Sequence, residues 1–295
     1  MIRINTVQHL KNHLNSFRNQ GKSIGFVPTM GALHQGHISL INAAKSESDV
    51  VVCSIFVNPT QFNDLNDLAK YPRTLEIDSL LLEAAGCDIL FSPEVAEMYS
   101  EAELELKRQK KEDKSWSEGK AVDFGSLAMV MEGAQRPGHF NGVAQVVSKL
   151  FRIVVPQKAF FGQKDFQQLA IIRSMVKQLD MPIEIIACPI VREANGLAMS
   201  SRNERLTKDE REQASAISRA LFKVKDLYSI KNVEQLKALV ENEINLVPQL
   251  ELEYFDMVDA QTLQPLTSFS QAKSAVACIA VKIGDVRLID NVLLF

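Results

Sequence analysis

The first two-thirds of the chain alternate short, mostly apolar runs with longer segments whose apolar residues recur every three to four positions. The run at 50–57, VVVCSIFV, is apolar almost throughout, as expected of a central parallel strand covered on both faces. The predicted strands are 23–27, 50–57, 88–91, 158–161 and 183–187. Strand and helix in alternation predict an α/β fold with a doubly wound parallel sheet, in which ligands bind beyond the carboxyl ends of the strands.

Three helices are predicted between these strands from the spacing of their apolar residues. In 142–155 these residues follow the pattern i, i+3, i+4, i+7, i+8 and i+11, which indicates a helix with one buried face. Similar patterns cover 169–179 and 77–85.

The pattern changes after about residue 190. Residues 207–210, TKDE, form a capping-box sequence that opens a helix ending near Tyr228, and a second helix is predicted at 233–245. Strand-like runs with turn signals between them follow at 252–258, 275–283 and 287–294. Helices followed by strands indicate a smaller α+β domain, so two domains are predicted, residues 1–190 and 191–295.

Composition narrows the class of protein. Apolar residues make up 46% and charged residues 23% of the chain, as in soluble globular proteins, and the net charge of −3 gives no reason to expect a nucleic-acid or membrane partner. The four cysteines stand singly, which argues against zinc-binding and thioredoxin-like motifs and favours a reduced, cytoplasmic setting. No apolar stretch is long enough to span a membrane, and the N-terminus lacks the apolar region of a signal peptide.

Residues 101–120 carry many charges of both signs. Because the signs are mixed, a mobile or solvated insertion is favoured over a patch that binds nucleic acid.

The strongest candidate site is the segment 28–37, PTMGALHQGH, which follows a short apolar strand and enters a helical pattern. A strand, a glycine turn and a helix start point backbone N–H groups and the positive end of the helix dipole at an anion. His34 and His37 lie three residues apart, on the same side of that first turn. Both ring N–H groups are therefore candidates for hydrogen bonds to a phosphate.

A second candidate segment, Gly162–Asp165, directly follows another predicted strand. The small Gly162 allows a ligand to approach the backbone closely, and Lys164 offers a flexible positive charge for phosphate oxygens. Asp165 is a candidate acceptor for ribose hydroxyls. The alternative is an ordinary strand-to-helix turn in which Asp165 is the N-cap.

Three further features are weaker on their own. The loop Met199–Arg202 offers two hydroxyls and a guanidinium, which suit an anion, although such sequences are common in surface loops. Gln61 and Gln168 are neutral amides that can orient a carboxylate without neutralising it, and the alternative is two surface glutamines. The segment 136–140, RPGHF, is interpreted as a structural turn, with Arg136 near the site.

Taken together, these segments resemble the pantoate–β-alanine ligase family nearly end to end. The resemblance is carried by FVPTMGALHQGH, FVNPTQF, YPRT, EGAQRPGHFNGV, FGQKDFQQL, AMSSRN and GDVRLIDN. It implies that pantoate, β-alanine and ATP, with Mg²⁺, give pantothenate, AMP and pyrophosphate through an enzyme-bound pantoyl adenylate. It also implies a Rossmann-like N-terminal domain, a smaller C-terminal lid domain and a homodimer.

The resemblance also implies roles for individual residues. By position, the expected contacts to ATP are Met30, Gly31, Ala32, Leu33, His34, Gln35, Gly36, His37, Gly162, Gln163, Lys164, Asp165, Val191, Met199, Ser200, Ser201 and Arg202. His37 would be a proton donor with His34 beside it, and Lys164 would complete the catalytic set. Gln61 and Gln168 would hold pantoate, with Gln61 also near β-alanine.

Some details of this assignment are specific. Val191 would meet the nucleotide through its backbone, and residues 199–202 would close over it. The family pattern has Glu where this chain has Gln163, which removes one negative charge near the nucleotide.

Two other functions share part of the pattern. A nucleotidyltransferase acting on a phosphorylated acceptor would use the same His-x-Gly-His chemistry but would need additional basic residues. A non-catalytic regulator would bind the nucleotide without turnover.

Overall fold

The computed structural model describes residues 1–62, 65–108 and 122–295. These divide into two compact units. The first comprises Met1–Phe124, Arg136–Gly162 and Gln168–Cys188, and the second comprises Gly125–Gln135, Gln163–Gln167 and Pro189–Phe295. Of the charged stretch 101–120, residues 101–108 form helix α6, and the remainder lies outside the described residues.

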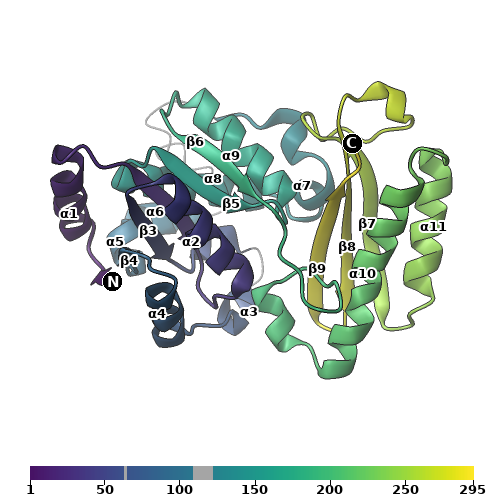
Figure 1. Ribbon diagram of the computed structural model, residues 1–295, viewed down its shortest axis with the longest axis horizontal. Helices are drawn as coiled ribbons and strands as arrows, with labels where there is room; N and C mark the ends of the chain where they lie inside the picture. Colours follow the sequence, from purple (N-terminus) through teal and green to yellow (C-terminus); the bar gives the residue numbers. More distant parts are fainter. Residues whose placement is uncertain (63–64, 109–121) are drawn as a thin grey trace. The chain divides into compact units, whose positions relative to one another are not determined.

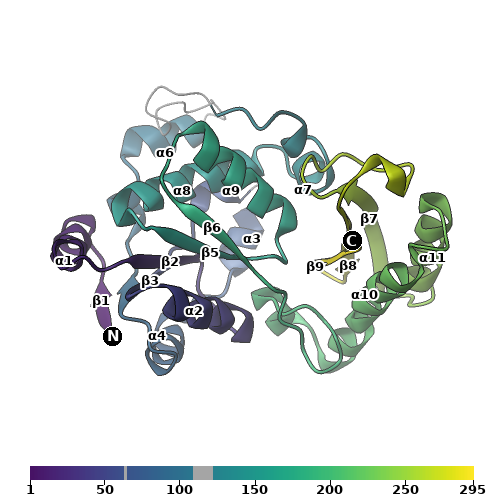
Figure 2. The same cartoon turned by 45° about the horizontal axis from the view of Figure 1, so that its top comes forward.

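The first unit is built on a six-stranded sheet in the order β1-β4-β3-β2-β5-β6, with every pair parallel (Figures 1 and 2). The strands are β1 Ile2–Ile4, β2 Ile24–Thr29, β3 Val50–Ile55, β4 Ile89–Phe91, β5 Lys158–Gly162 and β6 Glu184–Cys188. The predicted doubly wound α/β sheet is confirmed, and β1 is an additional edge strand that the sequence pattern did not reveal.

Helices cover both faces of this sheet. The helices of this part of the chain are α1 Val7–Asn19, α2 Gln35–Glu47, α3 Leu65–Lys70, α4 Leu75–Ala84, α5 Val95–Met98, α6 Glu101–Arg108, α8 His139–Val154 and α9 Phe166–Gln178. Helices α2 and α4 bury Ile41 and Leu82 against Val27 and its neighbours on one face. On the other face, the ring of Phe151 from α8 packs edge-on against Phe26 of β2, with 6.3 Å between ring centroids.

The sheet has one topological switch point. From β2 the chain runs outward to β3 and then β4, and it later returns to place β5 on the other side of β2, with β6 beyond it (Figures 1 and 2). Because β2 and β5 are neighbouring parallel strands, their carboxyl ends at Thr29 and Gly162 lie at the same edge of the sheet. Ligands of doubly wound folds bind at such a point.

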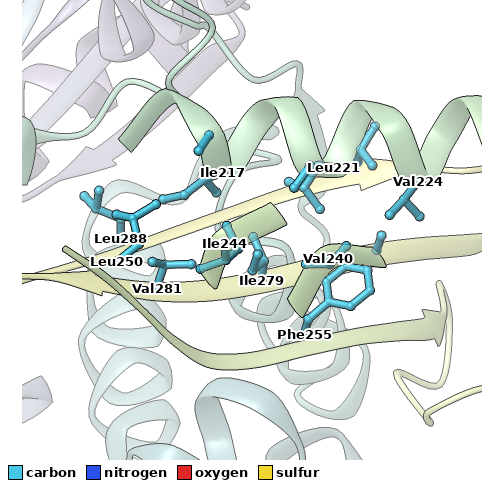
Figure 3. Close-up of a cluster of buried hydrophobic side chains, with 14 of the residues drawn as sticks. Ile217, Leu221, Val224, Val240, Ile244, Leu250, Phe255, Ile279, Val281 and Leu288 are labelled. Carbon is cyan, nitrogen blue, oxygen red and sulfur yellow. The ribbon is translucent and has the colours of Figure 1, made fainter. Parts of the chain in front are cut away.

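The second unit contains a three-stranded antiparallel sheet, β7-β8-β9, formed by Leu250–Asp259, Ala275–Ile283 and Val286–Leu293. Helices α10, Lys208–Leu227, and α11, Val233–Asn245, pack their apolar faces against it (Figure 3). The predicted capping box at 207–210 opens α10.

The second unit also includes two segments from earlier in the chain. One is 125–135, which holds α7, Met131–Gln135, and the other is 163–167. The buried amide of Gln167 joins them by donating to the carbonyl oxygens of Leu127 and Val130, at 2.7 and 2.9 Å. Among the helices of the described residues, none is both long and apolar enough to cross a membrane.

Candidate active site

The loop after β2 is held by a buried carboxylate. Asp78 of α4, 1% exposed, accepts the backbone N–H groups of Ala32 and Leu33 at 2.9 and 2.8 Å. Gly31 has a φ of +83°, and a Cβ atom there would lie 3.0 Å from both Asp78 and Ile55, so a larger residue would be strained at this position. The backbone N–H groups of Ala32 and Leu33 thus bond to a carboxylate of the protein itself, and that this loop also contacts a nucleotide stays a prediction.

The two histidines form the start of α2 and cap it reciprocally. The Nδ1 atom of His34 accepts the N–H of Gly36 at 3.1 Å, and the Nδ1 atom of His37 accepts the N–H of His34 at 3.3 Å. Because both Nδ1 atoms act as acceptors, the proton of each neutral ring resides on Nε2. The ring centroids lie 4.2 Å apart, so the two rings are close neighbours, and that their Nε2–H groups donate to a phosphate stays a prediction.

Gln61 lies in the turn after β3, η1 Pro59–Gln61, and is only 8% exposed. Its Oε1 atom accepts from Nδ2 of Asn58 at 3.2 Å, and its Nε2 atom lies 2.8 Å from the sulfur of Met30. The hydroxyl of Tyr99 donates to Oδ1 of Asn58 at 2.9 Å, and burial raises the pKa of Tyr99, so this hydroxyl stays protonated. The amide of Gln61 is thus held in one orientation beside Met30.

The segment 136–140 leads into the start of helix α8 and contacts the turn that carries Gln61. The Nδ1–H of His139 donates to the backbone oxygen of Gln61 at 2.9 Å, and its Nε2 lies 3.3 Å from a guanidinium nitrogen of Arg136. One turn later, a Cβ atom on Gly142 would lie 2.5 Å from the carbonyl oxygen of Thr60. Helix α8 therefore supports the turn that carries Gln61, a role that the sequence analysis missed.

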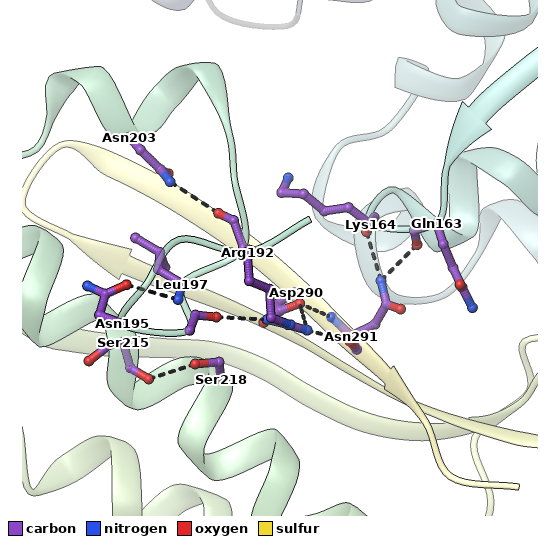
Figure 4. A network of polar contacts seen from close by, with 12 residues as sticks. Gln163, Lys164, Arg192, Asn195, Leu197, Asn203, Ser215, Ser218, Asp290 and Asn291 are labelled. Carbon is purple, nitrogen blue, oxygen red and sulfur yellow. Dashed lines mark hydrogen bonds and ion pairs between the residues drawn. The ribbon is translucent and has the colours of Figure 1, made fainter. Parts of the chain in front are cut away.

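In the second unit, β9 holds the turn that follows β5. The side-chain Nδ2 of Asn291 donates to the backbone oxygens of Gln163 and Lys164, at 3.0 and 2.8 Å (Figure 4). Asp165 follows directly and precedes α9.

The loop 191–202 is also fixed from within the second unit. The N–H of Met199 donates to the oxygen of Val191 at 3.0 Å, which ties two expected nucleotide contacts together. Ser200 caps the 3-10 helix η4, Ser201–Arg205, by accepting the N–H of Arg202 at 3.2 Å. Asn203, 1% exposed, donates to the carboxylate of Glu193 at 2.7 Å.

Comparison with known proteins identifies the family. A family model described as Pantoate-beta-alanine ligase matches residues 2–293. The chain is 51% identical to pantothenate synthetase of Bacteroides fragilis, covering 98% of this chain and 97% of the relative, and 52% identical to that of Phocaeicola vulgatus, covering 98% of both. The solved pantothenate synthetase of Thermus thermophilus is 39% identical, covers both chains fully and has a TM-score of 0.89.

The chain belongs to the pantoate–β-alanine ligase family. It is therefore a ligase that forms a carbon–nitrogen bond, as the sequence resemblance implied. The match along nearly the whole chain favours this activity over the nucleotidyltransferase and the non-catalytic regulator. A further structure, of pantoate–β-alanine ligase from Francisella tularensis complexed with Beta-gamma ATP and Beta-alanine, is 37% identical, covers 100% of this chain and 98% of its own, and has a TM-score of 0.75.

The site residues expected of this ligase are divided between the two units. The first unit holds Met30–His37, Gln61, Gly162 and Gln168, and within it Met30 and Gln61 are in contact. The second unit holds Gln163, Lys164, Asp165, Val191 and Met199–Arg202. That both groups bind one ATP molecule stays a prediction.

Proposed function

We propose that the chain condenses pantoate with β-alanine at the expense of ATP, releasing pantothenate, AMP and pyrophosphate, as a step in making a coenzyme A precursor. The observation that carries this proposal is the pair of Nε2–H donors of His34 and His37 at the start of α2, beside the switch point of the sheet. Two further findings support it: the full-length family match, and the binding of Beta-gamma ATP by the Francisella tularensis relative.

In the first step, the carboxylate of pantoate attacks the α-phosphorus of ATP. A phosphorus–oxygen bond forms to the carboxylate, the bond to the β-phosphate oxygen breaks, and pyrophosphate leaves. Gln61 and Gln168 would orient the carboxylate through neutral amides, which leave it nucleophilic. His34, His37 and Lys164 would stabilise the charge that spreads over the phosphate oxygens.

The remaining nucleotide contacts come from both units. Residues 30–33, 35 and 36 would follow the nucleotide from the loop after β2, and Gly162–Asp165 would hold ribose and phosphates. Val191 and Met199–Arg202 would close over the nucleotide.

In the second step, the unprotonated amine of β-alanine attacks the acyl carbon of pantoyl adenylate. The carbon–nitrogen bond forms, the acyl–oxygen bond to AMP breaks, and the amine loses a proton. Gln61 would lie near β-alanine in this step. A closed site keeps water from hydrolysing the adenylate, and we infer that residues 191–295 serve as a lid on a nucleotide- and pantoate-binding domain of residues 1–190.

Magnesium would enter with the triphosphate. Within the described residues, no group of three or more His, Cys, Asp or Glu side chains is arranged to hold a metal ion. Mg²⁺ commonly keeps its waters and binds through substrate phosphates instead of an all-protein cage, so we assign it no protein ligand. We further propose a cytoplasmic homodimer, a setting that suits four reduced, buried cysteines.

The proposed function is tested by pyrophosphate–ATP exchange with and without pantoate. We expect exchange only when pantoate is present, and we expect His37→Ala to lose about 100- to 1,000-fold in exchange rate while remaining folded by circular dichroism. Exchange supported only by a phosphorylated acceptor would instead indicate a nucleotidyltransferase, and ATP binding without exchange would indicate a regulator.

A further inference from the structure

Two adjacent residues of β9, Asp290 and Asn291, reach different parts of the candidate nucleotide site. They belong to the segment GDVRLIDN and are 3% and 2% exposed. Neighbouring side chains on a strand point to opposite faces of the sheet. The pair can therefore contact two separate segments of the second unit at once (Figure 4).

Asn291 uses both hydrogens of its amide nitrogen. They are donated to the carbonyl oxygens of Gln163 and Lys164, at 3.0 and 2.8 Å, and the side chain of Lys164 extends away from these bonds (Figure 4). An aspartate of the same shape has no such donors. The Oδ1 atom of Asn291 is buried without a hydrogen-bond partner among the described residues, so the contacts of this side chain to the turn are the two bonds that its nitrogen donates.

Asp290 fixes the neighbouring loop. Its two oxygens accept from the guanidinium of Arg192 at 2.6 and 3.0 Å, and the same guanidinium donates to the oxygen of Gly196 and lies over the ring of Phe222. Arg192 follows Val191, whose oxygen binds the N–H of Met199. Burial raises the pKa of Asp290 despite this ion pair. A buried ion pair adds little net stability, because removing both charges from water offsets their attraction. The pair therefore accords with a role for Asp290 in orienting the loop.

We propose that Asn291 is a positioning residue for the nucleotide: it fixes the backbone from which Lys164 reaches the phosphates. This inference rests on the proposed function. Asn291 does not itself touch a reacting atom; it acts through Lys164, while Asp290 holds the adjoining loop through Arg192.

The test is a double-mutant cycle read by pantoate-dependent pyrophosphate exchange. Asn291→Asp and Asn291→Ala each remove both donors, and each should lower kcat/KM for ATP by about 10- to 100-fold with little change in KM for pantoate, since a displacement near 1 Å has effects of this order. In the Lys164→Met background, Asn291→Asp should change kcat/KM for ATP by less than about twofold, because the group that it positions is already gone.

Val292→Ala is the matched control, because this buried neighbour on β9 packs into the apolar core of the second unit. It should lower the unfolding temperature without changing KM for ATP. Two results would each overturn the positioning role: Asn291 variants with the wild-type kcat/KM for ATP, or losses that multiply fully with that of Lys164→Met. Wild-type protein without pantoate-dependent exchange would instead overturn the proposed function.

Discussion

Replacing Gly142 by alanine should displace the turn that carries Gln61 while leaving the protein folded. A Cβ atom at this position would lie 2.5 Å from the carbonyl oxygen of Thr60 and 2.8 Å from Cα of Gln61. Ordinary van der Waals contact begins near 3.4 Å. Both obstructing atoms are backbone, so no side-chain rotation relieves the overlap, and helix α8 and the turn must move apart by roughly 1 Å.

The expected cost in stability is small because two effects oppose one another. Overpacking costs about 1–3 kcal/mol. Alanine is favoured over glycine within a helix by about 1 kcal/mol. We therefore expect the unfolding temperature of Gly142→Ala to fall by no more than about 5 °C.

The effect on activity should be much larger. A shift of about 1 Å at a substrate-positioning group can lower the rate by about 100-fold. In pantoate-dependent exchange, Gly142→Ala should lose activity on this scale, with KM for pantoate raised more than KM for ATP. Asn141→Ala changes an exposed neighbour on the same helix and serves as the control. Wild-type kinetics in folded Gly142→Ala would refute the argument that this close contact sets the position of Gln61.

Three further predictions concern stability and reactivity. Thr207→Ala removes the N-cap of α10 and should lower the free energy of unfolding by about 1 kcal/mol in denaturant titration, whereas Thr207→Ser should stay near the wild type. Arg287→Met removes two hydrogen bonds of 2.7 Å to the buried carboxylate of Glu132 and should lower the free energy of unfolding by about 3 kcal/mol in the same titration. Lys282→Met, on the exposed side of β8, is the control and should change this free energy little. All four cysteines are buried, and burial raises the pKa of Cys87 to about 12. A thiol reagent at pH 8 should therefore label none of them in the native protein and all four in denaturant. Labelling of the native protein would contradict this expectation.

The sequence predicted those elements whose signals are local. The capping box at 207–210 needs only residues three positions apart, and α11, predicted at about 233–245, spans Val233–Asn245. The strand β1 spans three residues, too few for any period to show, and it pairs with β4, some 87 positions later. Such a strand is defined by its partner, which the chain brings close only on folding.

The histidine pair illustrates which part of the candidate site was predictable. Its placement at the start of a helix followed from the order of strand, glycine and apolar spacing. The tautomers of His34 and His37 could not be predicted from the sequence, because they depend on which backbone N–H each Nδ1 accepts. The role of Asp78 could not be predicted either, because its sequence neighbourhood is that of an ordinary amphipathic helix.

The supports that sequence reasoning missed share one physical property. Asp78, His139 and Asn291 each bond to backbone groups of a site loop that lies 45 or more positions away in the chain. A hydrogen bond to a backbone carbonyl or N–H does not depend on the side chain of the residue that is held. The amino-acid sequence therefore does not indicate which two residues form the bond. Such bonds constrain where a loop lies while leaving its side chains to contact ligands. Variants at these three positions should therefore perturb substrate KM and turnover through geometry, even where the ligand-contacting side chains remain unchanged.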